Sequence, residues 1–321
     1  MAVPGRLGSL LVLALWLAPW GALGCSRRLG SRSAELDRTI VVDGRKRSFS
    51  LHVPAGHSVG ALPLVIVLHG GGGTARGMRQ QTRGKLDELS DRDGFVVAYP
   101  DGVGKHWNDG RLPGEDEASR EHVDDVAFLA AMIDAVGREL SIDPKRVFAT
   151  GISNGGMMSY RLACDLSARI AAIAPVVASM SPVVVEGCHP GRPVPVLAIN
   201  GTSDPLVPWE GGQVHFGAKM LGEVLPVRKT VEHWARLDSC HSPPVDRDLP
   251  DRDPSDGVRA HVHEWGGCAP GADVVLYELE GGGHTWPGGE QYLPSTVVGP
   301  VCRDFDASEV AWEFFQRHPM R

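Results

Sequence analysis

The chain has 321 residues, of which 42% are hydrophobic and 22% are charged, a composition typical of a folded globular protein with ample apolar material for a core. Its formal net charge of −7 and the lack of a basic stripe argue against a nucleic-acid-binding protein. No internal repeat is present, so the length predicts one large domain rather than a repeat array.

The first 24 residues have the features of an export signal. Arg6 precedes an apolar run over residues 7–20, and Ala22-Leu23-Gly24 supplies the small residues of a cleavage site before Cys25. The apolar run is too short to span a membrane comfortably, although an uncleaved anchor is an alternative. We expect residues 1–24 to be removed and the mature protein to be secreted or extracytoplasmic. The same stretch resembles a bacterial lipobox, with Ala22 where Leu is usual, so Cys25 is a candidate for lipid attachment and the one predicted route to a membrane.

Strands and helices are predicted to alternate after a polar linker over residues 25–37. Residues 39–53 predict a hairpin, because Asp43-Gly44 is a strong turn signal. The clearest helix is 123–140, where apolar residues recur at helical spacing. Continuous apolar runs predict strands that are buried on both faces, namely 64–68, 95–99, 147–150, 173–177 and 194–199. This alternation predicts an α/β fold with a mostly parallel sheet and helices on both faces, and ligand chemistry belongs at the carboxyl ends of such strands.

The C-terminal third begins with an unusual polar stretch. Residues 241–257 contain Pro, Asp and Arg and almost no apolar side chain, so we expect a solvated surface loop without the spacing of a calcium-binding EF-hand. The last predicted strands are 258–265 and 274–279, and 309–317 predicts a helix. His261 and His263 share one strand face, but zinc needs at least three protein ligands and no third is evident. We therefore predict no metal and no cofactor.

The strongest local motif is Gly151-Ile152-Ser153-Asn154-Gly155, a G-x-S-x-G sequence. It follows a predicted strand and precedes a predicted helix over 157–164. Such a strand-to-helix turn projects the serine hydroxyl, and the helix N-terminus favours developing negative charge. The motif predicts Ser153 as a nucleophile, and the alternative is a glycine-rich turn that happens to contain serine.

A serine hydroxyl is a weak nucleophile that needs a base, and in this type of fold the partners follow in the order Ser, Asp or Glu, His. Asp204 leaves the carboxyl end of the strand 194–199, and His284 lies in a glycine-rich loop after the strand 274–279. Their position and order predict Asp204 as the acid and His284 as the base. An ordinary turn role for Asp204, with Asp101 as the acid instead, is the alternative.

A glycine-rich loop follows the strand 64–68 directly. Its sequence, His69-Gly70-Gly71-Gly72-Gly73, is of the HGGG type found in lipases and esterases. The backbone N–H groups of Gly71 and Asn154 are predicted to bind an oxyanion. A phosphate-binding loop is less consistent with the sequence, because the Gly-Lys-Ser/Thr ending and the G-x-G-x-x-G pattern are both missing.

Five cysteines follow Cys25 without the CxxC spacing of a zinc site, and in an exported protein they are disulfide candidates. They are Cys164, Cys188, Cys240, Cys268 and Cys302. We predict a Cys164–Cys188 disulfide that ties the nucleophile helix to the loop before the acid strand. A Cys240–Cys268 disulfide would close the polar stretch. Cys302 then stays free, or pairs with Cys25 if that residue carries no lipid.

Five motifs together resemble one family. They are VLHGGGG, YPDG followed by Trp107-Asn108, GISNGGMMSYRLAC, NGTSDPLVPWEGG and LEGGGHTWPGG. They are similar to the polyhydroxybutyrate-depolymerase-type esterases, a family related to feruloyl and acetylxylan esterases, and the resemblance runs from about Thr39 to His318. It implies an α/β-hydrolase domain over residues 38–321, with Ser153 as nucleophile, Asp204 as acid and His284 as base. Extracellular polymer depolymerases often add a polymer-binding domain, which this sequence lacks after its last predicted helix.

These features predict an exported serine esterase that works through an acyl-enzyme on soluble esters with a small or aromatic acyl group, or on short hydroxyalkanoate oligomers. Trp107, Trp209 and Trp286 lie near strand ends or catalytic loops and are predicted to line the substrate pocket, unless they only pack the loops. Two other classes stay open. A serine peptidase uses the same fold and triad, and an inactive hydrolase fold can serve as a binding protein.

Overall fold

The computed structural model describes residues 1–2, 32–56, 60–111 and 116–321. Most of the predicted signal segment, together with Cys25, lies outside the described residues. Within the described part, none of the helices combines the length and the apolar character that a membrane crossing requires.

Ten strands of the described part form one sheet. They are β1 (Ala34–Val42), β2 (Arg45–Val53), β3 (Leu62–Leu68), β4 (Val96–Pro100), β5 (Ile142–Ile152), β6 (Ala172–Val176), β7 (Val196–Gly201), β10 (Ser242–Asp248), β11 (Arg259–Gly266) and β12 (Val274–Glu280). Their order is β1-β2-β4-β3-β5-β6-β7-β12-β11-β10. The six from β4 to β12 run parallel, and two further strands join each edge in antiparallel pairs. The predicted mostly parallel sheet is therefore confirmed.

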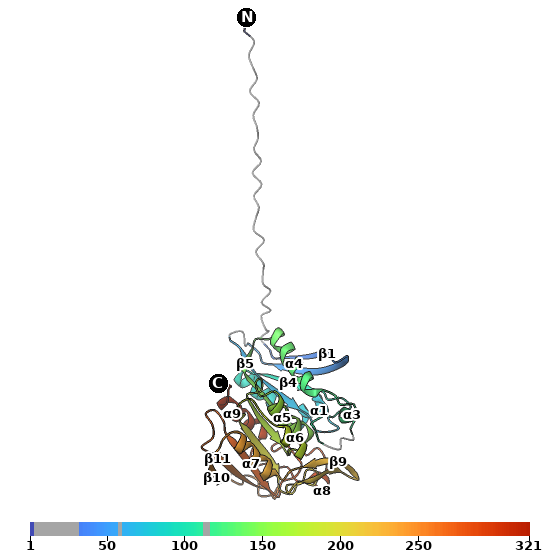
Figure 1. Cartoon of the computed structure of the whole chain (residues 1–321), viewed down its shortest axis with the longest axis vertical. Helices are drawn as coiled ribbons and strands as arrows, with labels where there is room; N and C mark the ends of the chain where they lie inside the picture. The colour runs from blue at the N-terminus through green and yellow to red at the C-terminus, as the bar shows by residue number, and fades with distance from the viewer. Residues whose placement is uncertain (3–31, 57–59, 112–115) are drawn as a thin grey trace.

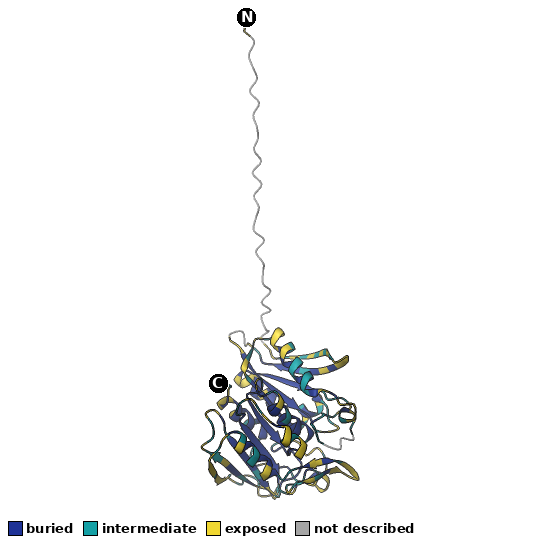
Figure 2. Ribbon diagram, in the orientation of Figure 1, coloured by how far each residue is buried: buried dark blue, intermediate teal, exposed yellow. Residues whose placement is uncertain are grey.

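Helices cover both faces of this sheet (Figure 1). They are α1 (Ala75–Gln81), α2 (Lys85–Asp93), α3 (Glu117–Arg120), α4 (Asp125–Glu139), α5 (Asn154–Asp165), α6 (Pro182–Gly187), α7 (Val227–Leu237), α8 (Ser295–Val298) and α9 (Ala307–Arg317). The larger helices α4, α5 and α7 share one apolar cluster with the sheet, and α1, α2 and α9 share the other. In β3, Leu64 and Ile66 belong to the first cluster while Val65 and Val67 belong to the second, which explains why the whole strand is apolar. Figure 2 shows the buried strands beneath helices whose outer sides are exposed.

The parallel strands bring the predicted site together at one edge. The glycine-rich loop follows β3, the G-x-S-x-G turn follows β5, Asp204 follows β7 and His284 follows β12. Because parallel strands end at the same edge of a sheet, these four segments lie on the same side of the molecule. A separate hairpin of β8 (Gly212–Phe216) and β9 (Lys219–Val224) extends the loop after Asp204.

Two segments differ from the expectation. The first strand begins at Ala34, inside the predicted linker, and pairs with β2 from Ala34 opposite Val53. Its start, Ala-Glu-Leu-Asp, alternates apolar and polar residues, which is the pattern of a half-buried strand. The predicted loop 241–257 contains β10, an exposed edge strand whose pairing with β11 is irregular between Ser242 and Val245. Proline is tolerated there because an edge strand leaves some N–H groups unpaired.

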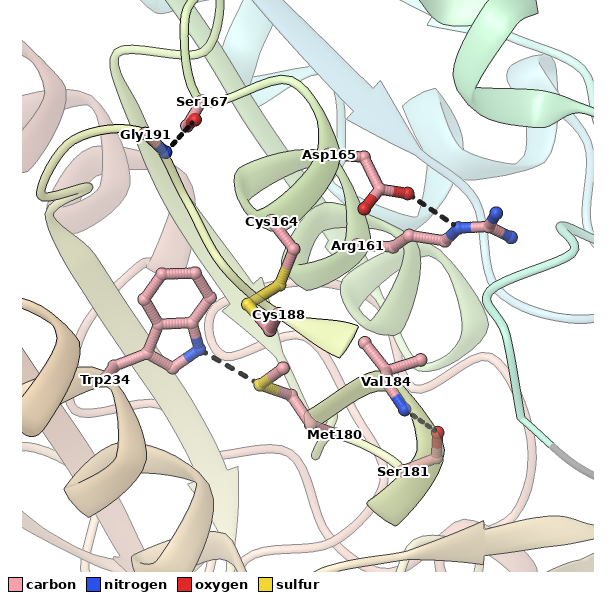
Figure 3. Close-up of a disulfide and its surroundings, with 10 residues drawn as sticks. All are labelled: Arg161, Cys164, Asp165, Ser167, Met180, Ser181, Val184, Cys188, Gly191 and Trp234. Atoms are coloured by element: carbon pink, nitrogen blue, oxygen red, sulfur yellow. Dashed lines mark hydrogen bonds and ion pairs between the residues drawn. A yellow bond between two sulfur atoms is a disulfide. The ribbon is translucent and has the colours of Figure 1, made fainter. Parts of the chain in front are cut away.

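Both predicted disulfides are confirmed. Cys164–Cys188 joins the end of α5 to the residue after α6 (Figure 3), and Cys240–Cys268 closes the segment that holds β10. Their sequence separations are 24 and 28, and a loop of this size corresponds to about 3 kcal/mol in the chain-entropy model. Cys302 is a buried free thiol, and burial raises its pKa to about 12.

Candidate active site

Ser153 occupies a strained turn between β5 and α5. Its φ of +56° and ψ of −122° lie in a region that residues with a side chain rarely adopt. The flanking glycines are required by close packing, since a Cβ at Gly155 would lie 2.3 Å from the Leu68 carbonyl oxygen and one at Gly151 would lie 2.6 Å from the same atom. The Ser153 N–H donates to the Val176 carbonyl at 2.9 Å. The ends of β3 and β6 thus hold the turn in place.

Asp204 and His284, 80 residues apart in the sequence, form a buried pair. The distance between Asp204 Oδ2 and His284 Nδ1 is 2.7 Å, and their side chains are 2% and 3% exposed. The other carboxylate oxygen accepts from the N–H groups of Leu206 and Val207 at 2.8 and 2.9 Å. A carboxylate can only accept, so Nδ1 carries the proton, and in the neutral ring Nε2 keeps a lone pair.

The Ser153 hydroxyl has no hydrogen bond to His284 among the described residues. The hydroxyl lies on the same sheet edge, and catalytic hydrogen bonds often tighten only when a substrate is bound. The Nε2 of His284 likewise has no partner in the described part of the chain. The arrangement therefore contains a strained serine, a carboxylate–imidazole pair and an imidazole nitrogen that is free to accept a proton.

Backbone packing and one tyrosine hold the loop that carries His284. A Cβ at Gly283 would lie 2.3 Å from the Val298 carbonyl oxygen, which explains the glycine run before the histidine. The Tyr292 hydroxyl donates to the His284 carbonyl at 3.1 Å, and the tyrosine is 40% exposed. Burial of the hydroxyl, aided by the negative charge of Asp204, raises the pKa of Tyr292. Tyr292 could not be recognised from the sequence, because no spacing rule links it to the histidine.

The glycine-rich loop lies beside the serine turn. A Cβ at Gly70 would lie 3.5 Å from the Ser153 Cβ. The N–H of Gly71 donates to no described residue, and Asn154, as the first residue of α5, has no intrahelical acceptor for its own N–H. Both groups are thus available to an oxyanion near Ser153.

His69 fixes this loop rather than acting as a base. Its Nδ1 donates to the Gly70 carbonyl at 2.8 Å, and its Nε2 accepts from the Gly102 N–H at 3.0 Å. Burial lowers the pKa of His69, which favours this neutral form. The Gly72 N–H donates to the Lys105 carbonyl at 2.8 Å. The segment around Lys105 is therefore bound to the glycine-rich loop at two points.

The side chain of Asn154 links the serine turn to the same segment. Its Oδ1 accepts from the Trp107 N–H at 2.8 Å, and its Nδ2 donates to the Trp107 carbonyl at 2.9 Å and to Asp109 Oδ2 at 2.7 Å. Asp109 also accepts from the Arg111 side chain. From the sequence only a backbone role was predicted for Asn154, and Asp109 could not be recognised, because the contact joins residues 45 positions apart.

Residues 47–207 match the family model of the PHB depolymerase esterases. The chain belongs to this family. It is 31% identical over 285 residues to a protein of Nocardia uniformis subsp. tsuyamanensis provisionally named esterase NocK, with 86% of this chain and 81% of the relative covered. It is 28% identical over 325 residues to a protein of Aspergillus terreus (strain NIH 2624 / FGSC A1156) provisionally named feruloyl esterase C, covering 98% and 99%. The esterase is thus an enzyme of the carboxylic-ester-hydrolase class.

Two further comparisons, one with a sequence relative and one with a solved structure, bear on the family and on the fold. Feruloyl esterase B of Piromyces equi is 31% identical over 232 residues, which cover 70% of this chain and 40% of that longer protein. The solved acetyl xylan esterase from Aspergillus awamori superposes with a TM-score of 0.55 at 16% identity, covering 78% of this chain and 94% of that one. Its similarity confirms the predicted α/β-hydrolase fold.

Two of the three tryptophans predicted to line a pocket do not do so in the esterase. Trp107 and Trp286 are 0% exposed. The indole N–H of Trp107 donates to the His69 carbonyl at 2.9 Å, and that of Trp286 donates to the Ser308 hydroxyl at 3.1 Å. Both rings pack inside the loops rather than against a pocket, because a large apolar ring is more stable when it is buried than when it is exposed to water. Trp209 is partly buried, with the Arg228 guanidinium 5.9 Å from its ring, and its pocket role stays a prediction.

The remaining candidates have partners other than the three triad residues. Asp101 accepts from the Ala75 N–H at 2.8 Å at the start of α1, so it does not orient His284. His261 and His263 each lie between two carboxylates from the neighbouring strands β10 and β12, partners that the sequence did not reveal. Among the described residues, one group has three metal-ligating atoms within 4.8 Å of one another, and it comprises Glu35, His52 and Asp87. Arg79 already pairs with both of its carboxylates.

Proposed function

We propose that this esterase is an exported serine hydrolase that cleaves its substrates through an acyl-enzyme on Ser153. The observation that supports this most strongly is the buried Asp204–His284 pair, in which Nδ1 is held at 2.7 Å and Nε2 has no described partner. A histidine bound in this way is oriented as a base and has its imidazolium form stabilised by the carboxylate. Ser153, whose backbone is strained, follows β5 at the same edge of the sheet.

The proposed reaction has two halves. His284 Nε2 takes the proton of the Ser153 hydroxyl as its oxygen attacks the ester carbonyl, and the N–H groups of Gly71 and Asn154 bind the resulting oxyanion. The intermediate collapses, the C–O bond to the alcohol breaks, and His284 returns the proton to the alcohol. Water then attacks the acyl-enzyme and gives a proton to His284, and His284 passes it to the Ser153 oxygen as the bond to the acyl group breaks, which frees the acid and restores the Ser153 hydroxyl. Removal of one oxyanion donor typically costs about 3 kcal/mol of transition-state stabilisation.

The substrates we propose are soluble esters with a small or aromatic acyl group, or short hydroxyalkanoate oligomers. The names of the relatives from Piromyces equi and Aspergillus awamori support feruloyl or acetyl esters. Export is supported by the signal-like sequence of residues 1–24 and by two disulfides, which form in oxidising compartments. Lipid on Cys25 is a separate proposal, and the mass of the mature N-terminal peptide tests it.

One assay series tests the proposed function. The mature chain is incubated with methyl ferulate, an acetylated sugar, a hydroxybutyrate dimer and a peptide amide, and in parallel with a fluorophosphonate that labels active serines. We expect ester turnover and labelling at Ser153, both absent in Ser153→Ala. Full activity of that variant, or faster cleavage of the amide, would overturn the proposal.

A further inference from the structure

The turn that contains Trp107 contacts both segments that carry the N–H groups assigned to the oxyanion. On one side, the indole N–H of Trp107 donates to the His69 carbonyl at 2.9 Å, at the start of the glycine-rich loop. The neighbouring His106 ring packs on Gly71, where a Cβ would lie 3.1 Å from the ring Cδ2. On the other side, the turn binds the side chain of Asn154. The placement of this turn therefore sets the spacing of the Gly71 and Asn154 N–H groups.

The side-chain amide of Asn154 is held in one orientation. Its Oδ1 faces a donor, the Trp107 N–H at 2.8 Å, and its Nδ2 faces two acceptors, the Trp107 carbonyl at 2.9 Å and Asp109 Oδ2 at 2.7 Å. The Asp109 N–H donates to the Trp107 carbonyl at 3.0 Å, so residues 107–109 fold around the amide. Asn154 and Asp109 are each 3% exposed, so water competes little for these bonds.

Arg111 holds the Asp109 carboxylate in place. Arg111 Nε lies 3.0 Å from Oδ1 and 2.9 Å from Oδ2, and Oδ1 also accepts from the Arg111 N–H at 3.0 Å. A hydrogen bond to an ionised acceptor is about twice as strong as one between neutral groups, so the carboxylate holds Asn154 more firmly than a neutral oxygen would. The guanidinium also offsets a negative charge that would otherwise oppose an oxyanion nearby.

The bond from Asp109 acts on a strained part of the backbone. Ser153, with its φ of +56°, immediately precedes Asn154, and such strain persists only where the surrounding structure holds it. The side chain and the N–H of Asn154 belong to the same residue, so a shift of the amide side chain also moves the N–H that faces the oxyanion. Further along α5, Arg161 Nη1 donates to the Asn108 carbonyl at 2.6 Å, which fixes the turn to the same helix.

We propose that Asp109 is a positioning residue of the oxyanion site, which acts through Asn154 to fix the Asn154 N–H relative to that of Gly71. This inference rests on the proposed function and deepens it. Without Asp109 both donors are present but misaligned, so the transition state is stabilised less while the substrate binds as before. The expected loss is a part of the roughly 100-fold or more that removal of a whole oxyanion donor costs.

The test combines kinetics on 4-nitrophenyl butyrate with inhibition by phenylboronic acid, which bonds to the serine oxygen and presents a tetrahedral oxygen to the oxyanion donors. In Asp109→Ala we expect kcat per fluorophosphonate-labelled serine to fall about tenfold and the Ki of the boronic acid to rise about tenfold. Both half-reactions form an oxyanion, so both slow alike and KM stays within twofold. Asp109→Asn keeps an oxygen that can accept from Nδ2, and it recovers most of both losses.

A double variant tests whether Asp109 acts through Asn154. Asn154→Ala keeps the backbone N–H but cannot bind Asp109, so it should show losses at least as large, and adding Asp109→Ala should lower kcat no further. Asp238→Ala is the matched control, because Asp238 is 0% exposed and accepts from the Val194 N–H at the start of β7, at the opposite edge of the sheet. Its kcat per labelled serine and its Ki should stay within twofold of the wild type.

Other results overturn the inference. These are an unchanged kcat and Ki in folded Asp109→Ala, losses that add up in the double variant, or a rise in KM at constant kcat, which would mean that Asp109 contacts the substrate. If Asp109→Ala does not fold, Asn154→Ala decides, since an unchanged Ki there removes the role of the side-chain contact. Failure of the proposed function looks different, because hydrolysis is then independent of Ser153 and the boronic acid does not inhibit the wild type.

Discussion

Two buried histidines of this esterase differ in the number of ring nitrogens that are hydrogen-bonded to carboxylates. His284 meets Asp204 at Nδ1, and its Nε2 has no described partner. His52 on β2 meets Glu35 at Nδ1, at 2.6 Å, and Asp91 at Nε2, at 3.0 Å. A ring between two carboxylates must carry both protons, so it has no lone pair with which to act as a base. His52 instead joins β1 to α2.

The charges around His52 agree with this structural role. Burial lowers the pKa of His52, but the hydrogen bond to Glu35 and the charges of Asp87 and Asp91 outweigh that effect, and the pKa is raised. His261 and His263 repeat the arrangement on β11, each with one carboxylate from β10 and one from β12. In this comparison the number of ring nitrogens that carboxylates occupy, rather than burial, distinguishes His284, the proposed base, from His52.

The largest expected effect is at the serine and the histidine with the free nitrogen. Ser153→Ala and His284→Ala should each lower kcat on a 4-nitrophenyl ester by about 10,000-fold or more, as in triads generally. His263→Gln, which changes a histidine with two carboxylate partners, serves as the control and should stay within twofold of the wild type. Comparable losses in His263→Gln and His284→Ala would remove the distinction between the two kinds of histidine.

The next effect concerns the carboxylate of the pair. Asp204→Asn should lower kcat by about 1,000-fold to 10,000-fold, because an amide can donate to Nδ1 and so favours the wrong tautomer. The Asn Oδ1 can still accept from Leu206 and Val207, so the loop should keep its shape. Thermal unfolding measured beside the kinetics checks this. A loss of less than tenfold with an unchanged melting temperature would mean that another group orients His284.

A smaller effect is expected at Tyr292, which acts on the catalytic loop through the His284 carbonyl. Tyr292→Phe removes one neutral hydrogen bond and keeps the ring, so kcat should fall by about fivefold, equivalent to about 1 kcal/mol. As a positioning residue, it should alter kcat and leave KM nearly unchanged. A rise in KM at constant kcat would instead indicate that the hydroxyl contacts the substrate.

The smallest effect on activity, and the clearest on stability, is expected at His52. His52→Gln should leave kcat within twofold and lower the free energy of unfolding at pH 5.5 by about 1–2 kcal/mol, since it removes hydrogen bonds to charged partners. The folded-state pKa is raised above the unfolded value of about 6.5, so this stabilisation is complete below that pH and disappears as the pH rises through the folded pKa. The gap in melting temperature between wild type and variant should therefore narrow with rising pH, and a gap that widens would contradict the imidazolium assignment.

Much of the candidate site could be predicted from the sequence for a geometric reason. Ser153, Asp204 and His284 each follow a buried strand, and the carboxyl ends of parallel strands meet at one edge. The contacts of Tyr292 and His106 could not be predicted, because they depend on how irregular loops fold against that edge. The prediction for Trp107 and Trp286 was wrong for a related reason, since nearness to a catalytic loop does not show which side of the loop a ring packs against.

The disulfides were predictable because each closes a short loop next to a recognisable element, but the edge strands were not. The start of β1 lies in a segment of mostly polar residues, which does not stand out as a strand. β10 contains two prolines, and proline usually argues against a strand. Both strands lie at the rim of the sheet, where few side chains are buried. Hydrophobic patterning therefore gives its weakest signal there.

The buried thiol of Cys302 has a consequence for how the protein reaches its native pairing. Thiol–disulfide exchange proceeds through the thiolate, and a pKa of about 12 leaves almost none of it at neutral pH. In the native fold Cys302 is therefore a poor attacker of the two native bonds, whereas in an unfolded chain it competes with the other five cysteines for pairing. The correct isomer depends on burying this segment before the oxidant acts, so the yield of active enzyme from oxidative refolding is governed by the order of folding and oxidation.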